Sequence, residues 1–163
     1  MKVAETDLSG ALGAMRTLAP AGYALGFHII YTTPRFMFQT YPRDWFDHYN
    51  RNGLIMSDPT IAWGFEKTGT CRWSEMSDPT GVLAQAAEFG LRYGLTCATD
   101  TGDSRSIGGY ARSDREFERE EIEEISSLFN EVHTATHDAS GLDAETAARL
   151  HKLSIMFTHP GSD

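Results

Sequence analysis

The pattern of hydrophobic and polar residues in the first third of the chain predicts a helix, a strand hairpin and a second helix. Leucine and methionine recur at helical spacing and predict an amphipathic helix over 7–18. Two stretches rich in aromatic and β-branched residues, 22–32 and 35–40, flank a Thr-Pro turn and predict two paired strands. A helix over 41–53 follows, because a proline stands where it begins and a glycine where it ends.

The rest of the chain predicts a further series of elements. They are a short helix from Pro59 capped by Asp58, a brief strand at 71–73, a helix over 82–93, strands over 95–99 and 106–111, a helix over 115–132, a linker at 138–141 and a last helix over 142–157. Gly108 and Gly109 stand inside the last strand, where paired glycines indicate a bulge or the close approach of another group to the backbone.

This order of elements predicts an α/β (α+β) fold, a three-layer α/β/α sandwich with a central antiparallel sheet of about five strands. Hairpins on both sides of a helical insertion are more typical of signalling sensor domains than of a doubly wound fold, in which strand and helix alternate regularly. We expect residues 1–138 to form one domain and residues 139–163 to form a linker and a C-terminal helix.

Composition narrows the classes of function. The 163 residues are 40% hydrophobic, which indicates a globular domain with a sizeable core. Fourteen basic and 23 acidic residues give a net charge of −9, which argues against direct DNA binding because phosphates require a basic face. The sequence has no apolar run of about 20 residues, no signal-peptide core and no cysteine pair at metal-binding spacing, so we expect a reduced, cytoplasmic protein that does not enter a membrane.

No set of residues predicts catalysis. His133 and His137 stand four apart, as in one class of zinc proteases, but the residues between them are Thr-Ala-Thr and supply no glutamate base. We expect both histidines to be exposed near a helix end. Cys71 and Cys97 are expected in the core rather than as nucleophiles, and the acidic run 116–124 is expected to be a solvated helix face. The sequence therefore predicts no enzyme, no cofactor and no metal site.

The aromatic residues of the second predicted helix leave two interpretations open. Tyr41, Trp45 and Tyr49 fall at i, i+4 and i+8 and therefore share one face of a helix. They could be ordinary core, and Asp58 could be only a helix cap. They could also form the polar end of a small-molecule pocket.

Considered together, these residues resemble a known family. Trp45, Tyr49, Asp58-Pro59 and Trp73, which comes fifteen residues after Asp58, stand at the spacing of the autoinducer-binding domain of LuxR-type quorum-sensing transcriptional regulators. The segment from Gly90 to Thr96 also resembles the Gly-x-x-x-Gly-Leu-Thr segment of that domain. The similarity covers roughly residues 8–132.

The resemblance implies an N-acyl homoserine lactone as ligand. It implies that Trp45 donates its indole N–H to the lactone carbonyl, that Tyr41 donates to the amide carbonyl and that Asp58 accepts from the amide N–H, while Tyr49 and Trp73 wall the pocket. Such a set matches the ligand, because tryptophan can only donate and a carboxylate can only accept. Family members often carry a Ser or Thr near the end of the last strand, where this chain has Gly-Gly-Tyr-Ala, so we expect Tyr110 to line the pocket.

The sequence departs from the family at its C-terminal end. The family has a second, helix-turn-helix domain, whereas residues 142–150 resemble only the opening helix of such a domain. Either the protein is naturally truncated or this sequence is a fragment of a longer protein. We therefore expect a receptor that acts by sequestering the signal or by forming mixed dimers with a full-length LuxR-type regulator, with a homodimer as the other assembly. The alternative is an interaction module of the same fold that modulates a full-length regulator without binding a ligand.

Overall fold

The computed structural model describes residues 5–31 and 33–137. The predicted linker at 138–141, the predicted helix over 142–157 and the predicted helix-turn-helix remnant lie outside the described residues. Within them, no helix is long and apolar enough to cross a membrane.

Five antiparallel strands form the central sheet. They are β1 (Gly22–Ile30), β2 (Thr33–Gln39), β3 (Gly69–Arg72), β4 (Tyr93–Asp100) and β5 (Arg105–Arg112), and they lie in the order β2-β1-β5-β4-β3. The predicted hairpin of the first two strands is confirmed, and a second hairpin joins β4 to β5. Because β1 pairs with β5 at the centre, the two hairpins form one continuous sheet.

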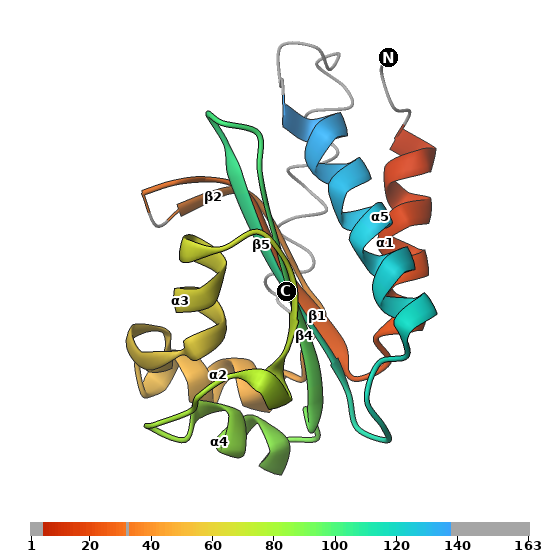
Figure 1. The fold of residues 1–163 in the computed structure, drawn as a ribbon. Helices are drawn as coiled ribbons and strands as arrows, with labels where there is room; N and C mark the ends of the chain where they lie inside the picture. Colours follow the sequence, from red (N-terminus) through yellow and green to blue (C-terminus); the bar gives the residue numbers. More distant parts are fainter. Residues whose placement is uncertain (1–4, 32, 138–163) are drawn as a thin grey trace, which may run out of the picture.

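Helices cover both faces of this sheet, which confirms the predicted three-layer architecture (Figure 1). The helices α1 (Glu5–Leu18) and α5 (Arg119–His137) lie side by side on one face. The opposite face is covered by α2 (Arg43–Arg51), η1 (Leu54–Ser57), α3 (Pro59–Glu66), η2 (Trp73–Glu75) and α4 (Val82–Glu88), where η denotes a short 3-10 helix.

The two faces of the sheet carry different side chains. Toward α1 and α5, the strands present large buried residues: Tyr23, Leu25, Phe27, Phe38, Leu95 and Tyr110. Toward α2, α3 and α4, the central strands carry mostly small residues: Ala24, Gly94, Thr96, Ile107, Gly109 and Ala111. We call this second set the small-residue face. The aromatic rings that pack on this face come mainly from the helical layer. Because the strand residues beneath them are small, these rings can approach the strand backbone closely.

The helix predicted over 82–93 is shorter than expected and ends at Glu88. Gly90 has a φ of +94°, its N–H donates to the carbonyl of Ala87, and the N–H of Leu91 donates to the carbonyl of Ala86. These two bonds are the Schellman pattern that ends helices at a left-handed glycine. The chain therefore turns at Gly90 and is free to begin β4 at Tyr93.

The long helix predicted from residue 115 begins instead at Arg119. The carboxylate of Glu121 accepts the backbone N–H of Glu118 at 2.8 Å and also binds the guanidinium of Arg115. The first of these bonds is half of a capping box, which fixes the helix start. The expectation of a wholly solvated acidic face is therefore wrong for Glu121.

The expectation that His133 is exposed is also wrong. It is 1% exposed, its ring stacks on that of His28 with 4.6 Å between centroids, and its Nδ1 lies 2.6 Å from the hydroxyl oxygen of Ser106. His28 belongs to β1 and Ser106 to β5. A histidine of α5 therefore joins the helix to the centre of the sheet.

Candidate ligand-binding site

A second apolar cluster lies between the small-residue face and the layer formed by α2, α3 and α4. Its buried members are Trp45, Leu54, Trp73, Val82, Ala86, Leu91 and Ala111, and Tyr41, Tyr49 and Phe89 pack against it. Four of the residues predicted to bind a ligand belong to this cluster, and each brings a polar atom into otherwise apolar surroundings.

Trp73 lies directly over the sheet. A Cβ on Gly94 would stand 1.7 Å from the indole ring, so only glycine leaves room for it. The indole Nε1–H donates to the hydroxyl of Thr96 at 3.1 Å. Two residues of the Gly-Leu-Thr segment therefore hold Trp73 in place, and its own donor is already used.

Tyr41 extends from the end of β2 across the small-residue face. Its hydroxyl oxygen would be 2.9 Å from a Cβ on Gly109, which explains one of the paired glycines as a close approach to the backbone. Burial raises the pKa of Tyr41, and the carboxylate of Asp58 raises it further, so the hydroxyl stays protonated. Among the described residues this hydroxyl has no hydrogen-bond partner.

Trp45 is the buried residue of α2. Its ring contacts Tyr49 at 5.6 Å in an edge-on arrangement, His48 at 5.8 Å and Phe89 at 5.4 Å between centroids. The indole N–H finds no acceptor in the part of the chain that the structure describes. The ring is 4% exposed, but this N–H is not among the fully buried polar atoms that lack a partner, so it is open to an incoming acceptor.

Asp58 is the predicted helix cap, and its carboxylate also binds a second side chain. One carboxylate oxygen caps α3 by accepting the backbone N–H of Thr60 at 2.9 Å and its hydroxyl at 2.7 Å. The other accepts the hydroxyl of Tyr49 at 2.7 Å. Burial and this neighbouring carboxylate raise the pKa of Tyr49, which keeps it a donor. Since a carboxylate has about four lone-pair positions, Asp58 can still accept one further bond.

The structure thus brings together Tyr41, Trp45, Tyr49, Asp58 and Trp73, with two unpaired donors and one acceptor of remaining capacity. Tyr110 does not join them. It follows Gly109 on β5 and therefore points to the opposite face, where its hydroxyl contacts the sulfur of Met15 and its ring meets Tyr23 at 6.0 Å. The expectation that Tyr110 lines the same pocket is therefore wrong.

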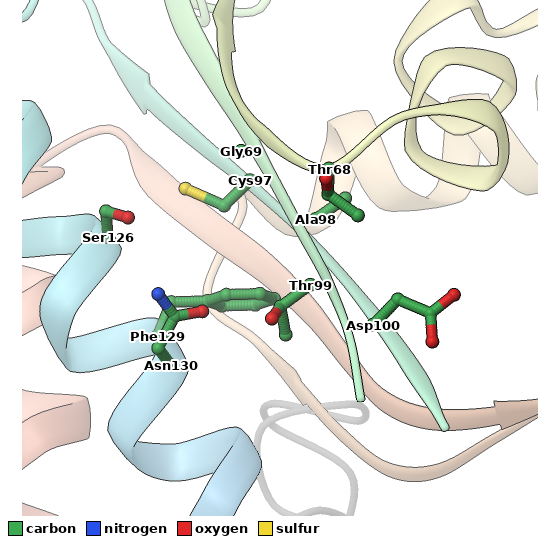
Figure 2. Close-up of a pocket in the computed structure, with 9 residues that line it drawn as sticks. All are labelled: Thr68, Gly69, Cys97, Ala98, Thr99, Asp100, Ser126, Phe129 and Asn130. Carbon is green, nitrogen blue, oxygen red and sulfur yellow. The ribbon is translucent and has the colours of Figure 1, made fainter. Parts of the chain in front are cut away.

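Two cavities of about 210 Å³ lie elsewhere. The first is between β4 and α5, where Ser126, Phe129 and Asn130 face Cys97 and Thr99 (Figure 2). Burial raises the pKa of Cys97, so its thiol stays protonated and packs as a small apolar group, as predicted.

The second cavity is lined by Trp73, Ser74, Leu83, Ala84, Arg92, Tyr93 and Glu116. The polar atoms of Tyr41, Trp45 and Asp58 line neither cavity. Beside Trp45 the space is filled by side chains, among them Phe89. A ligand at these atoms would therefore have to displace the rings that now pack there.

Sequence reasoning missed three residues that support the site. Thr96 holds Trp73, Thr60 orients Asp58, and Gln39 is a buried glutamine at the end of β2. The first two stand within segments that the family resemblance had already marked. A glutamine beside aromatic strand residues was the only signal for the third.

Comparisons with known proteins identify relatives of the chain. A family model described as the autoinducer binding domain matches residues 15–138. The transcriptional activator protein SolR of Ralstonia nicotianae is 26% identical over 104 residues, which cover 62% of this chain and 44% of SolR. The chain thus spans less than half the length of this curated relative.

Solved structures share the fold. One is the N-acylhomoserine lactone dependent LuxR family transcription factor CepR2 of Burkholderia cenocepacia, with a TM-score of 0.54, 19% identity and coverage of 81% of this chain and 92% of that one. Escherichia coli SdiA gives a TM-score of 0.60 at 19% identity, covering 100% of this chain and 68% of that one. SdiA in complex with octanoyl-rac-glycerol gives 0.57 at 15% identity, covering 97% and 79%.

Proposed function

This chain belongs to the autoinducer binding domain family of LuxR-type regulators, and from this premise we propose that it is a receptor for an N-acyl homoserine lactone. The observation that carries the proposal is the pair of unpartnered donors, Tyr41 hydroxyl and Trp45 indole N–H, in one apolar cluster with the Asp58 carboxylate. The lactone head offers two carbonyl oxygens and one N–H, which is the complementary set.

In the proposed mode, Trp45 donates to the lactone carbonyl, Tyr41 donates to the amide carbonyl and Asp58 accepts the amide N–H. Tyr49 would hold the carboxylate in place through its existing 2.7 Å bond, and Trp73 would form a wall over Gly94. Each unmade bond in such a buried head costs about 1–3 kcal/mol, whereas each methylene of the acyl tail contributes only about 0.8 kcal/mol. We therefore expect strict selection of the head group and graded selection of chain length.

The family is a signal-binding regulatory domain rather than an enzyme family. We extend this to the chain itself and propose that it neither cleaves nor transfers its ligand. The assembly predicted from the sequence, a homodimer or a mixed dimer with a full-length regulator, stays a prediction, as does its cytoplasmic location.

The test compares thermal melting with and without a panel of acyl homoserine lactones, using variants that alter one polar atom each. Asp58→Asn is the sharpest, because asparagine is as good a helix cap but places an N–H donor where a carboxylate oxygen accepted. We expect it to weaken binding by roughly ten- to a hundredfold, in line with about 1–3 kcal/mol for a mismatched buried polar group. Tyr41→Phe should weaken binding to a similar extent. Its control is Tyr31→Phe, because Tyr31 is 93% exposed and should not affect lactone binding.

A second candidate function is favoured by the packed rings beside Trp45: an interaction module that binds no ligand. It predicts that no lactone raises the melting midpoint and that Asp58→Asn melts the same way with and without lactone. Octanoyl-rac-glycerol, which SdiA binds in a solved complex, adds a third arm because it lacks the amide N–H. If Asp58→Asn binds the lactone as tightly as the parent does and also leaves the affinity for the acylglycerol unchanged, the proposed role of Asp58 is wrong.

A further inference from the structure

Gln39 is a buried side chain with an unused donor. It is the last residue of β2 and 1% exposed, and its Nε2 has no hydrogen-bond partner among the described residues. The backbone N–H of Tyr41 donates to its Oε1, which fixes the orientation of the amide. A flipped amide would oppose two donors, so the unpaired atom is the NH₂ group rather than the oxygen.

The register of the sheet places Gln39 on the small-residue face. Gln39 pairs with Ala24, Ala24 pairs with Gly109, and Gly109 pairs with Thr96, so these four residues form one row on one face. Between Gln39 and Thr96 the row carries only a methyl group and a hydrogen. Over Gly109 lies the Tyr41 hydroxyl. Gln39 is therefore a neighbour of the group proposed to bind the amide carbonyl of the ligand.

Buried NH₂ groups are nearly always paired, because an unmet donor keeps its desolvation cost and gains nothing in return. In the proposed mode each carbonyl of the lactone head already accepts one bond, from Trp45 or Tyr41, so the head could serve Nε2 only as an acceptor shared with one of these donors. The next part of the ligand beyond the amide carbonyl is the start of the acyl chain. An oxygen atom there could accept the otherwise unpaired N–H of Gln39.

We propose that Gln39 is a specificity-determining residue that donates its Nε2–H to an oxygen near the head of the acyl chain, so that the protein prefers acyl chains with an oxo or hydroxyl group there over unsubstituted ones. This rests on the proposed lactone-binding function. An unsubstituted chain would leave Nε2 unpaired in the complex, as a hydrogen-bonding site penalises an analogue that lacks its partner.

The experiment measures dissociation constants by titration calorimetry for two homoserine lactones of equal chain length. One carries an oxo group at the third carbon of the acyl chain, counted from the amide carbonyl, and the other has an unsubstituted chain. The parent protein should bind the oxygenated lactone about tenfold more tightly, a typical ratio for one buried hydrogen bond. Gln39→Met, which keeps the length of the side chain but removes both the donor and the acceptor of the Tyr41 N–H, should bring the ratio of the two affinities close to one, even if both affinities fall.

Gln39→Glu is a second variant that keeps the acceptor for the Tyr41 N–H and replaces the donor with an oxygen. It should lose more affinity for the oxygenated lactone than for the unsubstituted one. Glu88→Met, at an exposed residue of α4, should keep the parent ratio. The proposal for Gln39 is overturned if the parent binds both lactones equally well, or if Gln39→Met keeps the parent's ratio of affinities. In either case, binding of the unsubstituted lactone by the parent still supports the receptor function. Binding of neither lactone overturns both.

Discussion

Lowering the pH from 7 to 5 should destabilise the fold by at least about 2 kcal/mol, because two stacked histidines are buried in the neutral form. Burial, followed by the charges of His133 and His137, lowers the pKa of His28 from 6.5 to about 4. Burial also lowers the pKa of His133. Groups of both signs face this pair: His137 and Arg35 oppose a proton, whereas Asp100 and Asp103 favour one.

The hydrogen bonds explain why the neutral form fits. The Thr136 hydroxyl donates to the carbonyl of Val132, so it can only accept from His28 Nε2–H at 2.9 Å. That leaves His28 Nδ1 as an acceptor for the hydroxyl of Ser104. Assigned this way, a second ring proton at Nδ1 would require the Ser104 hydroxyl to turn its own proton away and accept instead.

The magnitude follows from the two pKa values of His28. The unfolded chain takes up this proton near pH 6.5 and the folded chain only near pH 4. Stability is therefore fully present above about pH 6.5 and falls by ~1.4 kcal/mol for each pH unit until about pH 4. Down to pH 5 the loss from His28 is about 2 kcal/mol, to which His133 adds. Asp103, Asp114 and Glu121, whose pKa values are lowered, lose their contributions only below about pH 4, outside this range.

The assay is urea unfolding at pH 7, 6 and 5, for the parent and for His28→Asn. His28 has a φ of +57°, a backbone conformation that asparagine tolerates better than most residues, so this variant removes the titrating ring with little added strain. The variant should lose clearly less stability between pH 7 and 5 than the parent. If both lose the same amount, or if the His28 ring signals in NMR titrate above pH 6, the buried neutral pair is the wrong explanation.

Two further predictions concern glycines. Gly94→Ala should destabilise the protein by about 2–4 kcal/mol in urea unfolding, because a Cβ there would overlap the Trp73 ring and break its bond to Thr96. The control is Gly13→Ala on the exposed side of α1, which should stabilise the protein by about 0.5–1 kcal/mol. Equal effects of the two substitutions on stability would refute the packing argument. Gly109→Ala should displace the Tyr41 hydroxyl, cost no more than about 1 kcal/mol of stability and weaken lactone binding as much as Tyr41→Phe does; unchanged lactone affinity would remove Tyr41 from the proposed site.

Local signals in the sequence were sufficient for most elements and for the grouping of the site. Residues Tyr41, Trp45 and Tyr49 share a face because of the helical period, and Asp58 before Pro59 marks a helix start; both features need only short-range geometry. The helix predicted over 82–93 was too long because a hydrophobic repeat continued through Gly90, whose left-handed backbone ends it.

Features that depend on distant partners could not be predicted in the same way. Tyr110 and Gly109 are neighbours on one strand, so a single step of register decides which of them faces the candidate site. Because two adjacent glycines stand in this strand, the alternation of large and small residues that would have shown the register is missing. His133 is buried because His28 and Ser106 meet it from the sheet, which no spacing along the chain reveals. The unpaired amide of Gln39 required the positions of its neighbours.

The unequal faces of the sheet divide the molecule into two layers of different cohesion. On one side the strands contribute their own large side chains, including Tyr23, Phe27 and Leu95, to a core shared with α1 and α5. On the other side, α2, α3 and α4 contribute the rings and the strands provide mainly backbone. We therefore expect the helical layer to separate from the sheet by local opening more readily than the larger core unfolds, as partly independent folding units do. Such an opening would give a buried ligand a route in and out that does not require global unfolding.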